Sequence, residues 1–567
     1  MDELRDVLKK VILELYGIDF VPEIVPAPEN IDADYSSNAP LKLAKELHKN
    51  PFEIAEEISE KVDESFVSRP GFVNFKLPDK YLDEKIAQLT EKFEVSLDTF
   101  KGKTIVCEFS DPNPFKVLHV GHLYTSVVGD AIARLFEHAG AKVVRANFGG
   151  DVGLHVAKTM YALLLEPTDD LTIEEIARCY VKGTAAYEDN PEAKAKITEL
   201  NKEIYKINAK DIHGTELSDL YWKGRELSYD YFKEFYARIG VKFDKYYPES
   251  TVANLGLSKV LEELEKGVYE KSDGAVVFDG EKYGLHTRVF VNREGVPTYE
   301  AKDVGLIFKK YEDYHFDKSV VITGNEQLEY MKVVLKSVEQ YAPDLVEKTS
   351  HLTHGLVKLP GNEKMSSRKG NFLKAVDVLD MVANELKSQY NSDDSKVSMA
   401  ALKYAFLKYK MGGDIIFDPK ESVKMTGNSG PYLLYSVVRA KKILRMVDEA
   451  DGSEQGLENA GSGSETAGQG LEKTQEGLEV HFETAERELV KKLLEYKVVL
   501  NDAVSEMAPH KLANYLYEVA QEFSRFYEKC PVVGSENEIQ RFLIVKLYLN
   551  TMESGLNILG IEVPEEM

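Results

Sequence analysis

The stretch that decides the fold runs from residue 104 to residue 147. It contains two apolar runs, Thr104-Ile105-Val106-Cys107-Glu108-Phe109 and Lys142-Val143-Val144-Arg145-Ala146-Asn147. Between them, from about Gly121, apolar residues recur at helical spacing until Gly140. A strand, a helix and a second strand within about 45 residues form a right-handed βαβ unit, so the sequence predicts a parallel sheet.

Outward from this unit, the chain divides into four predicted parts. Residues 1–100 are expected to form an α+β domain in which a helical run ends near Pro51. Residues 101–375 hold the parallel sheet, with a mainly helical insertion at about 156–245. Residues 376–424 are expected to form a connecting stem, and residues 425–567 an all-α helical bundle. Within the bundle, the Gly/Ser/Glu/Gln-rich residues 449–480 predict a disordered acidic loop, because they offer too little apolar surface to bury.

Composition narrows the class of protein. The 567 residues are 43% hydrophobic, and no apolar run is long enough to span a membrane. The three cysteines are widely spaced and the N-terminus does not resemble a signal peptide, so a cytoplasmic location is expected. The net charge of −25 is concentrated in residues 1–100 and 448–486, and it therefore does not exclude a nucleic-acid partner.

Two short motifs point to nucleotide chemistry. His119-Val120-Gly121-His122 stands between the first strand and its helix, where free backbone N–H groups suit phosphate oxygens and the glycine leaves room for a flat base. Two surface histidines or two zinc ligands would also explain it, although no further zinc ligand accompanies the pair. Lys364-Met365-Ser366-Ser367-Arg368-Lys369-Gly370 is a basic loop that either faces solvent or closes over a triphosphate.

H-x-G-H followed by K-M-S-S is similar to the pair of motifs that class I aminoacyl-tRNA synthetases use for ATP. Nearly the whole chain, apart from residues 449–480, resembles the arginyl-tRNA synthetase family. The resemblance rests on segments 108–122, 147–153, 299–303, 427–433, 526–532 and 560–567, which follow the family's order. It implies a Rossmann-like catalytic domain, an added N-terminal domain that touches the tRNA and a C-terminal bundle that reads the anticodon.

The resemblance also implies an ATP site. ATP, as its Mg2+ complex, would be bound by His119, Gly121, His122, Lys116, Lys364, Met365, Ser366, Ser367 and Arg368. Of these, His119, His122, Lys116 and Lys364 would be catalytic, through positioning and charge stabilisation. Ser367 and Arg368 stand where the general class I loop has Lys and Ser, so Lys116, Arg368 or Lys369 would supply the missing positive charge. No tightly bound cofactor and no metal site are expected.

A pocket selective for a guanidinium needs carboxylates and other acceptors. Asp303 follows Tyr299 by one helical turn, so the two lie on one face of a helix, although an exposed helix carboxylate would be the simpler interpretation of Asp303 alone. By resemblance, arginine would be bound by Glu108, Ser110, Asn113, Tyr299, Asp303 and Gln327.

Candidates for stacking on anticodon bases are Tyr432, Tyr435, Arg439, Phe526 and Tyr527, although most aromatic residues at helical spacing belong to the core.

The activity that the resemblance implies is that of a monomeric arginine–tRNA ligase whose partners are ATP, L-arginine and tRNA-Arg. Such an enzyme forms arginyl-adenylate and transfers arginine to the 3′ end of the tRNA, and activation is expected to require bound tRNA. Another class I synthetase is one alternative, which the Tyr299 and Asp303 pair disfavours. A nucleotidyltransferase that uses ATP is a second, although such chains are generally shorter. A non-enzymatic RNA-binding paralogue is a third, which the intact motifs disfavour.

Overall fold

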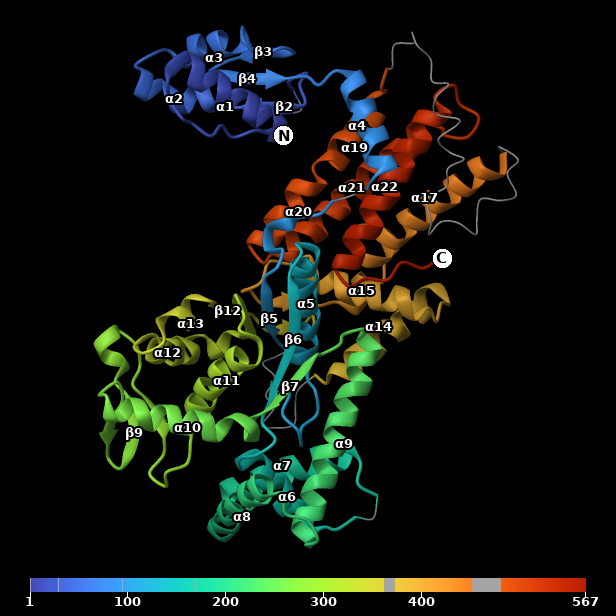
Figure 1. Ribbon diagram of the computed structural model, residues 1–567. Helices are drawn as coiled ribbons and strands as arrows, with labels where there is room; N and C mark the ends of the chain where they lie inside the picture. Colours follow the sequence, from blue (N-terminus) through green and yellow to red (C-terminus); the bar gives the residue numbers. More distant parts are fainter. Residues whose placement is uncertain (1, 29, 94, 169, 362–372, 451–480) are drawn as a thin grey trace. The chain divides into compact units, whose positions relative to one another are not determined.

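The computed structural model describes residues 2–28, 30–93, 95–168, 170–361, 373–450 and 481–567 (Figure 1). The chain forms two units. One comprises Met1–Val95, Ser436–Val498 and Tyr517–Met552, and the other comprises Ser96–Tyr435, Val499–Leu516 and Glu553–Met567. Most of the predicted acidic loop, residues 451–480, lies outside the described residues. In the described part of the chain, no helix is both long and apolar enough to cross a membrane.

The first unit begins with an α+β module, in which helices pack on an antiparallel sheet of strand order β1-β2-β4-β3. Its elements are α1 (Asp2–Tyr16), β1 (Val25–Pro26), β2 (Tyr35–Ser37), α2 (Ala39–Leu47), α3 (Pro51–Ser59), β3 (Ser65–Ser68), β4 (Phe72–Phe75) and α4 (Asp79–Glu91). The predicted helical run that ends near Pro51 corresponds to α2, and a further helix, α3, starts at Pro51 itself. Asn50 caps that helix by accepting a hydrogen bond from the Phe52 N–H, and proline suits the first helical position since its missing N–H would have no partner in the helix.

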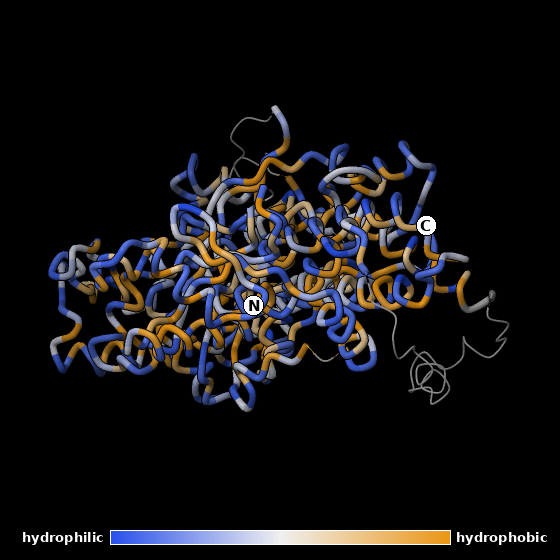
Figure 2. The backbone as a smooth tube through the Cα atoms, turned by 90° about the horizontal axis from the view of Figure 1, so that it is seen from above, coloured by the Kyte–Doolittle hydropathy of each residue, from blue (hydrophilic) through white to orange (hydrophobic). Residues whose placement is uncertain are grey.

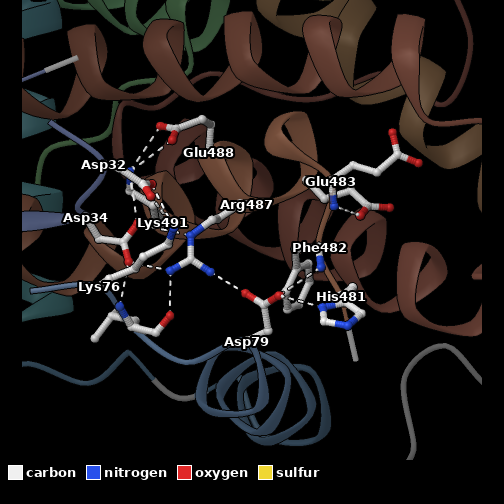
Figure 3. A network of polar contacts seen from close by, with 12 residues as sticks. Asp32, Asp34, Lys76, Asp79, His481, Phe482, Glu483, Arg487, Glu488 and Lys491 are labelled. Atoms are coloured by element: carbon white, nitrogen blue, oxygen red, sulfur yellow. Dashed lines mark hydrogen bonds and ion pairs between the residues drawn. The ribbon is translucent and has the colours of Figure 1, made fainter. Parts of the chain in front are cut away.

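Helix α19 (Thr484–Leu494) belongs to the same unit and is joined to the α+β module by a buried polar network (Figure 3). The guanidinium of Arg487 donates to the carboxylates of Asp34 and Asp79 and to the Leu77 carbonyl. Lys491 lies 3.4 Å from the Asp34 carboxylate. Because the Asp34 side chain is only 4% exposed, this carboxylate depends on these cations for its stability.

The second unit is built on a five-stranded parallel sheet of order β12-β11-β5-β6-β7, which confirms the predicted parallel sheet. The strands are β5 (Thr104–Glu108), β6 (Lys142–Gly149), β7 (Lys245–Pro248), β11 (Lys318–Gly324) and β12 (Thr349–His354). Helix α5 (Val120–His138) packs on β5 and β6, and α14 (Ala375–Tyr390) and α15 (Ser395–Leu407) pack on α5. Side chains of α10 (Glu249–Glu265) and α11 (Tyr299–Tyr314) join Val106 and Val144 in another cluster against the sheet. Hydrophobic residues are concentrated along the inner segments, and hydrophilic residues along the outer turns (Figure 2).

Two insertions interrupt the sheet. The helical one contains α6 (Leu154–Leu165), α7 (Ile173–Asp189), α8 (Pro191–Lys210) and α9 (Glu216–Ile239), packed around their own apolar cluster. Between β7 and β11, helices α10 and α11 flank an antiparallel sheet of β8 (Glu270–Ser272), β9 (Ala275–Phe278) and β10 (Arg288–Val291). Short 3-10 turns occur at η1 (Asp98–Phe100), η2 (Gly280–Tyr283) and η3 (Asn325–Gln327).

The remaining elements of the second unit follow β11. They are α12 (Leu328–Glu339), α13 (Pro343–Glu347), α16 (Pro419–Ser422) and the two-stranded parallel pair β13 (Val357–Lys358) and β14 (Ile415–Ile416). Four C-terminal helices have residues in both units: α17 (Gly430–Ala450), α20 (Tyr496–Ser505), α21 (Pro509–Lys529) and α22 (Glu538–Ile558). The predicted C-terminal all-α region is thereby confirmed.

Candidate active site

A cavity of about 810 Å3 opens at the carboxyl ends of the parallel strands. The chain passes from β5 to β6 on one side, while β11 pairs with the opposite edge of β5, so the strand order reverses at β5. Ligands of open parallel sheets bind at such a reversal. Glu108 at the end of β5, Gly324 at the end of β11 and His119 at the start of α5 all line the cavity. The fold therefore brings described residues of both predicted substrate sites to one cavity.

The two histidines of the H-x-G-H motif are held in one tautomer by the backbone. The His119 N–H donates to Nδ1 of His122, and the Gly121 N–H donates to Nδ1 of His119, each at 3.1 Å. Both Nδ1 atoms are acceptors, so each neutral ring carries its proton on Nε2. Burial lowers the pKa of His119 to about 4 and the pKa of His122 well below its usual range. At neutral pH the pair therefore supplies two uncharged N–H donors.

Gly121 is required by the ring of His119. A Cβ at this position would lie 2.9 Å from Cε1 and Nδ1 of that ring, which is closer than real Cβ contacts. The rings of His119 and His122 stack with their centroids 3.8 Å apart. The space that the sequence analysis assigned to a flat base is thus filled by an imidazole, and the glycine allows the two donors to lie side by side.

The predicted basic loop lies outside the described residues. Residues 362–372 lie outside the described residues, and with them Lys364, Met365, Ser366, Ser367, Arg368 and Lys369. The residue that follows them is anchored at the H-x-G-H turn, because the Val120 N–H donates to the Leu373 carbonyl at 2.9 Å. Lys116 does not line the cavity, and its Nζ lies 4.9 Å from the centroid of the Tyr180 ring.

Three predicted arginine ligands line the cavity at the end of β5 and directly after it: Glu108, Ser110 and Asn113. Each already has a partner in the protein. Glu108 forms a buried ion pair with Lys310 at 2.5 Å, and the hydroxyls of Ser110 and Tyr236 lie 2.9 Å apart. The side-chain oxygen of Asn113 accepts a hydrogen bond from the Gly150 N–H at 2.7 Å. These contacts fix the turn after β5.

Tyr299 and Asp303 line the cavity from the first turns of α11, and Gln327 lines it from η3. Helix α11 is placed by contact with α10 at two glycines. A Cβ at Gly256 would lie 1.8 Å from the Ala301 carbonyl oxygen, and a Cβ at Gly305 would lie 2.3 Å from that of Val252. The two backbones therefore touch, which fixes where the carboxylate of Asp303 enters the cavity.

The carboxylate of Asp303 is in an unusual environment. Tyr330 donates its hydroxyl hydrogen to one carboxylate oxygen. Burial is the main cause that raises the pKa of Asp303 to about 7, and the carboxylate of Glu108 contributes to the rise. A cation placed beside this group would stabilise its ionised form. The wall of the cavity is therefore suited to a guanidinium.

The cavity residues that the sequence analysis missed include Glu249, Arg288, Tyr330 and His354. Glu249 forms a buried ion pair with Lys302 at 2.8 Å, and His354 lies 2.8 Å from the Thr125 hydroxyl. Glu249 and His354 stand at or directly after the ends of parallel strands, which is a signal that could have found them. Arg288 and Tyr330 come from the antiparallel insertion and from α12, and the sequence gives no comparable signal for them.

The predicted tRNA contacts differ in exposure. Tyr435 is 41% exposed, and Tyr432 is half-buried. Tyr527 is 44% exposed, and the guanidinium carbon of Arg439 lies 4.5 Å from its ring centroid. The prediction for Phe526 is wrong for this structure, because its side chain is fully buried and packs beside Phe523 in the core. A phenylalanine at helical spacing here serves packing rather than base stacking.

Comparisons with known proteins agree with this geometry. The model of the catalytic domain of class I (R) tRNA synthetases matches residues 85–418. The arginyl tRNA synthetase N terminal domain matches residues 2–77, and the DALR anticodon binding domain matches residues 433–567. The catalytic-domain match alone covers more than half of the chain and defines its class.

Whole-length relatives identify the family. The chain is 29% identical to the arginine–tRNA ligase of Fusobacterium nucleatum over 100% of this chain and 99% of that protein. It is 30% identical to that of Treponema denticola over 83% of this chain and 80% of the relative. The chain belongs to the arginyl-tRNA synthetase family of class I aminoacyl-tRNA synthetases.

Solved structures share the fold. The arginyl-tRNA synthetase of Thermus thermophilus superimposes with a TM-score of 0.78 at 22% identity, with 100% of both chains covered. That of Plasmodium falciparum gives 0.74 at 20% identity, with 100% of this chain and 99% of the other covered. The predictions of the fold class and of a ligase of this family are confirmed.

Proposed function

We propose that this chain charges tRNA-Arg with L-arginine at the expense of ATP, and that the cavity at the end of β5 is the site of both steps. The observation that carries the proposal is the carboxylate of Asp303 in the wall of a cavity that Tyr299 and the imidazole pair also line. Among the described residues, its hydrogen-bond donor is a neutral phenol, so an arginine side chain would bring the cation.

The first step joins arginine to the nucleotide. The arginine carboxylate attacks the α-phosphate of Mg·ATP, an arginyl-adenylate forms and pyrophosphate leaves. His119 and His122 would donate their Nε2–H groups to phosphate oxygens, and Lys116 and Lys364 would stabilise the charge that develops on the leaving group. The backbone hydrogen bonds to both Nδ1 atoms support this role, since they set the donors before ATP arrives.

Recognition of arginine would use the residues around the guanidinium and the α-amino group. We assign Glu108, Ser110, Asn113, Tyr299, Asp303 and Gln327 to arginine, and the cavity adds Glu249. Asp303 would take the guanidinium, because an Asp–guanidinium contact is charge-assisted and directional. Three other carboxylates of the cavity already have cationic partners, since Glu108 and Glu249 pair with lysines and Glu300 pairs with Arg288. This favours Asp303 as the acceptor for an incoming cation.

The second step transfers arginine to RNA. A ribose hydroxyl at the 3′ end of the tRNA attacks the activated carbonyl, and AMP leaves. We infer that residues 425–567 bind the anticodon, with Tyr432, Tyr435, Arg439 and Tyr527 as candidate contacts, and that residues 1–100 touch the outer part of the tRNA. We also infer that the reaction depends on Mg2+ and that arginine is activated only when tRNA is bound. The protein is inferred to be a monomer in the cytoplasm.

The test of this function is ATP-dependent charging of total tRNA with each of the 20 standard amino acids in turn, together with arginine-dependent pyrophosphate exchange with and without tRNA. We expect charging with arginine alone, and exchange only when tRNA is present. Charging with another amino acid would retain the class and overturn the arginine pocket. Charging with none of them would favour a nucleotidyltransferase or a non-enzymatic RNA-binding protein.

A further inference from the structure

Behind Asp303, the cavity wall is completed by a tyrosine from a different element. Tyr330 lies in the first turn of α12, lines the same cavity and donates its hydroxyl hydrogen to Oδ2 of Asp303. Burial and the neighbouring carboxylate of Asp303 hold the pKa of Tyr330 well above its usual value. The phenol therefore keeps its proton at neutral pH and donates it in a hydrogen bond to the ionised carboxylate of Asp303.

The ring of Tyr330 is itself held in place. The guanidinium carbon of Arg288 lies 5.3 Å from the ring centroid, within the range of a cation–π contact. Arg288 also lies 3.3 Å from the carboxylate of Glu300. Glu300 thus offsets the charge of Arg288, so that a resident cation in the wall adds little repulsion toward a cationic substrate.

The orientation of a carboxylate needs such a partner. The last torsion of an aspartate side chain is broad, so Asp303 could present its oxygens in many directions. A guanidinium is best bound by two parallel hydrogen bonds, which only one orientation of the carboxylate allows. With one oxygen fixed by the phenol, the plane of the carboxylate is set before the substrate arrives.

We propose that Tyr330 is a positioning residue for arginine recognition, because its hydroxyl fixes the plane in which Asp303 presents its carboxylate to the guanidinium. The inference rests on the proposed function of the cavity and deepens it. Arg288 and Glu300 serve the same purpose indirectly, since Arg288 holds the ring of Tyr330 and Glu300 pairs with Arg288.

The hydroxyl also affects the ionisation of Asp303. The other titratable groups that act on this carboxylate are Glu108 of β5, Asp111 after β5, Glu249 of α10 and Lys310 on its own helix. The Tyr330 hydrogen bond lowers the pKa of Asp303 against the effect of burial. Without the hydroxyl the pKa rises, so more of the carboxyl is neutral at acidic pH and less can bind a cation.

The test is Tyr330→Phe, which removes one oxygen and keeps the ring. We measure the KM for arginine and for ATP in tRNA charging at pH 6.5 and at pH 8.5. The expected result is an arginine KM raised roughly tenfold at pH 8.5 and further at pH 6.5, because one hydrogen bond to a charged group is lost. The ATP KM should stay within about twofold of the wild type, since Tyr330 acts only on Asp303.

The matched control is Tyr341→Phe. The Tyr341 hydroxyl bonds to that of Tyr269 in the same apolar cluster, away from the cavity lining, so its loss should leave both KM values unchanged at both pH values. A rise in the arginine KM of Tyr330→Phe that is equal at the two pH values and matched by a rise in the ATP KM would indicate general damage and overturn the proposal.

A double-mutant cycle isolates the pair. In an Asp303→Asn background, Tyr330→Phe should change the arginine KM by less than about twofold, because the hydroxyl has lost the charged group on which it acts. Effects that add fully would overturn the proposal. A wild-type protein that never charges tRNA with arginine would instead overturn the proposed function. Normal wild-type charging with no effect of Tyr330→Phe would overturn this inference alone.

Discussion

At the scale of single residues, the H-x-G-H motif arranges two imidazole rings as hydrogen-bond donors. The order of His119, Gly121 and His122 lets two backbone N–H groups satisfy both Nδ1 atoms, which directs both Nε2–H groups away from the backbone. We predict that Gly121→Ala displaces the ring of His119, because the new Cβ would meet it at 2.9 Å. The kcat/KM for ATP should fall roughly a hundredfold in pyrophosphate exchange while the thermal unfolding midpoint stays close to that of the wild type.

Gly413→Ala is the control for this prediction, because a Cβ at Gly413 would meet no atom within 4 Å and its backbone is not left-handed. Equal exchange rates in both alanine variants and the wild type would show that the position of the His119 ring does not matter for ATP.

Some residues of the cavity could be predicted from the sequence, and others could not. The H-x-G-H motif predicted a nucleotide site only together with the later K-M-S-S motif, and Tyr299 and Asp303 could be paired from one helical turn. Tyr330 and Arg288 could not, because they come from separate elements and meet Asp303 only through the packing of α11 and α12 and the antiparallel strands. Phe526 was assigned to RNA since exposure cannot be read from a helical aromatic pattern, and the structure buries it completely.

At the scale of elements, helix α19 stabilises its own unit through Arg487. The Arg487 side chain is 13% exposed and bonds to the carboxylates of Asp34, directly before β2, and Asp79, at the start of α4 (Figure 3). We predict that Arg487→Ala destabilises the first unit by about 3 kcal/mol, because the carboxylate of Asp34 loses its main partner while it remains buried. Hydrogen exchange in β4 and α4 should become faster.

The control for this prediction is Arg525→Ala, whose side chain is 62% exposed and pairs with Glu522 in the same unit. Exposed pairs contribute roughly 0–1 kcal/mol, so little change is expected. Equal exchange rates for β4 and α4 in Arg487→Ala and Arg525→Ala would contradict the stabilising role of the network. This network was not predictable from the sequence, because Asp34 and Arg487 are more than 450 residues apart.

At the scale of the whole molecule, the parallel sheet could be predicted from one βαβ unit, and its strand order could not. The apolar patterns of residues 104–147 predict a strand, a helix and a second strand from neighbouring residues alone. The pairing of β11 with β5 joins segments about 210 residues apart, and only that pairing creates the reversal at which the cavity opens. Family resemblance supplied the arginine site, and the sheet topology explains why those residues meet.

The central claim is that the carboxylate of Asp303 selects arginine within this cavity, and Asp303→Ala tests it most directly. We would measure the kcat/KM for arginine in tRNA charging, and the Kd for ATP by equilibrium dialysis. We expect the arginine value to fall roughly a thousandfold, as for a buried charge contact, while the Kd for ATP stays within about twofold.

Glu312→Ala on the same helix is the matched control, since that side chain is 67% exposed and pairs with Lys309. It should leave both quantities unchanged. A kcat/KM for arginine in Asp303→Ala that equals that of Glu312→Ala would contradict the account, because the cation would then be recognised elsewhere.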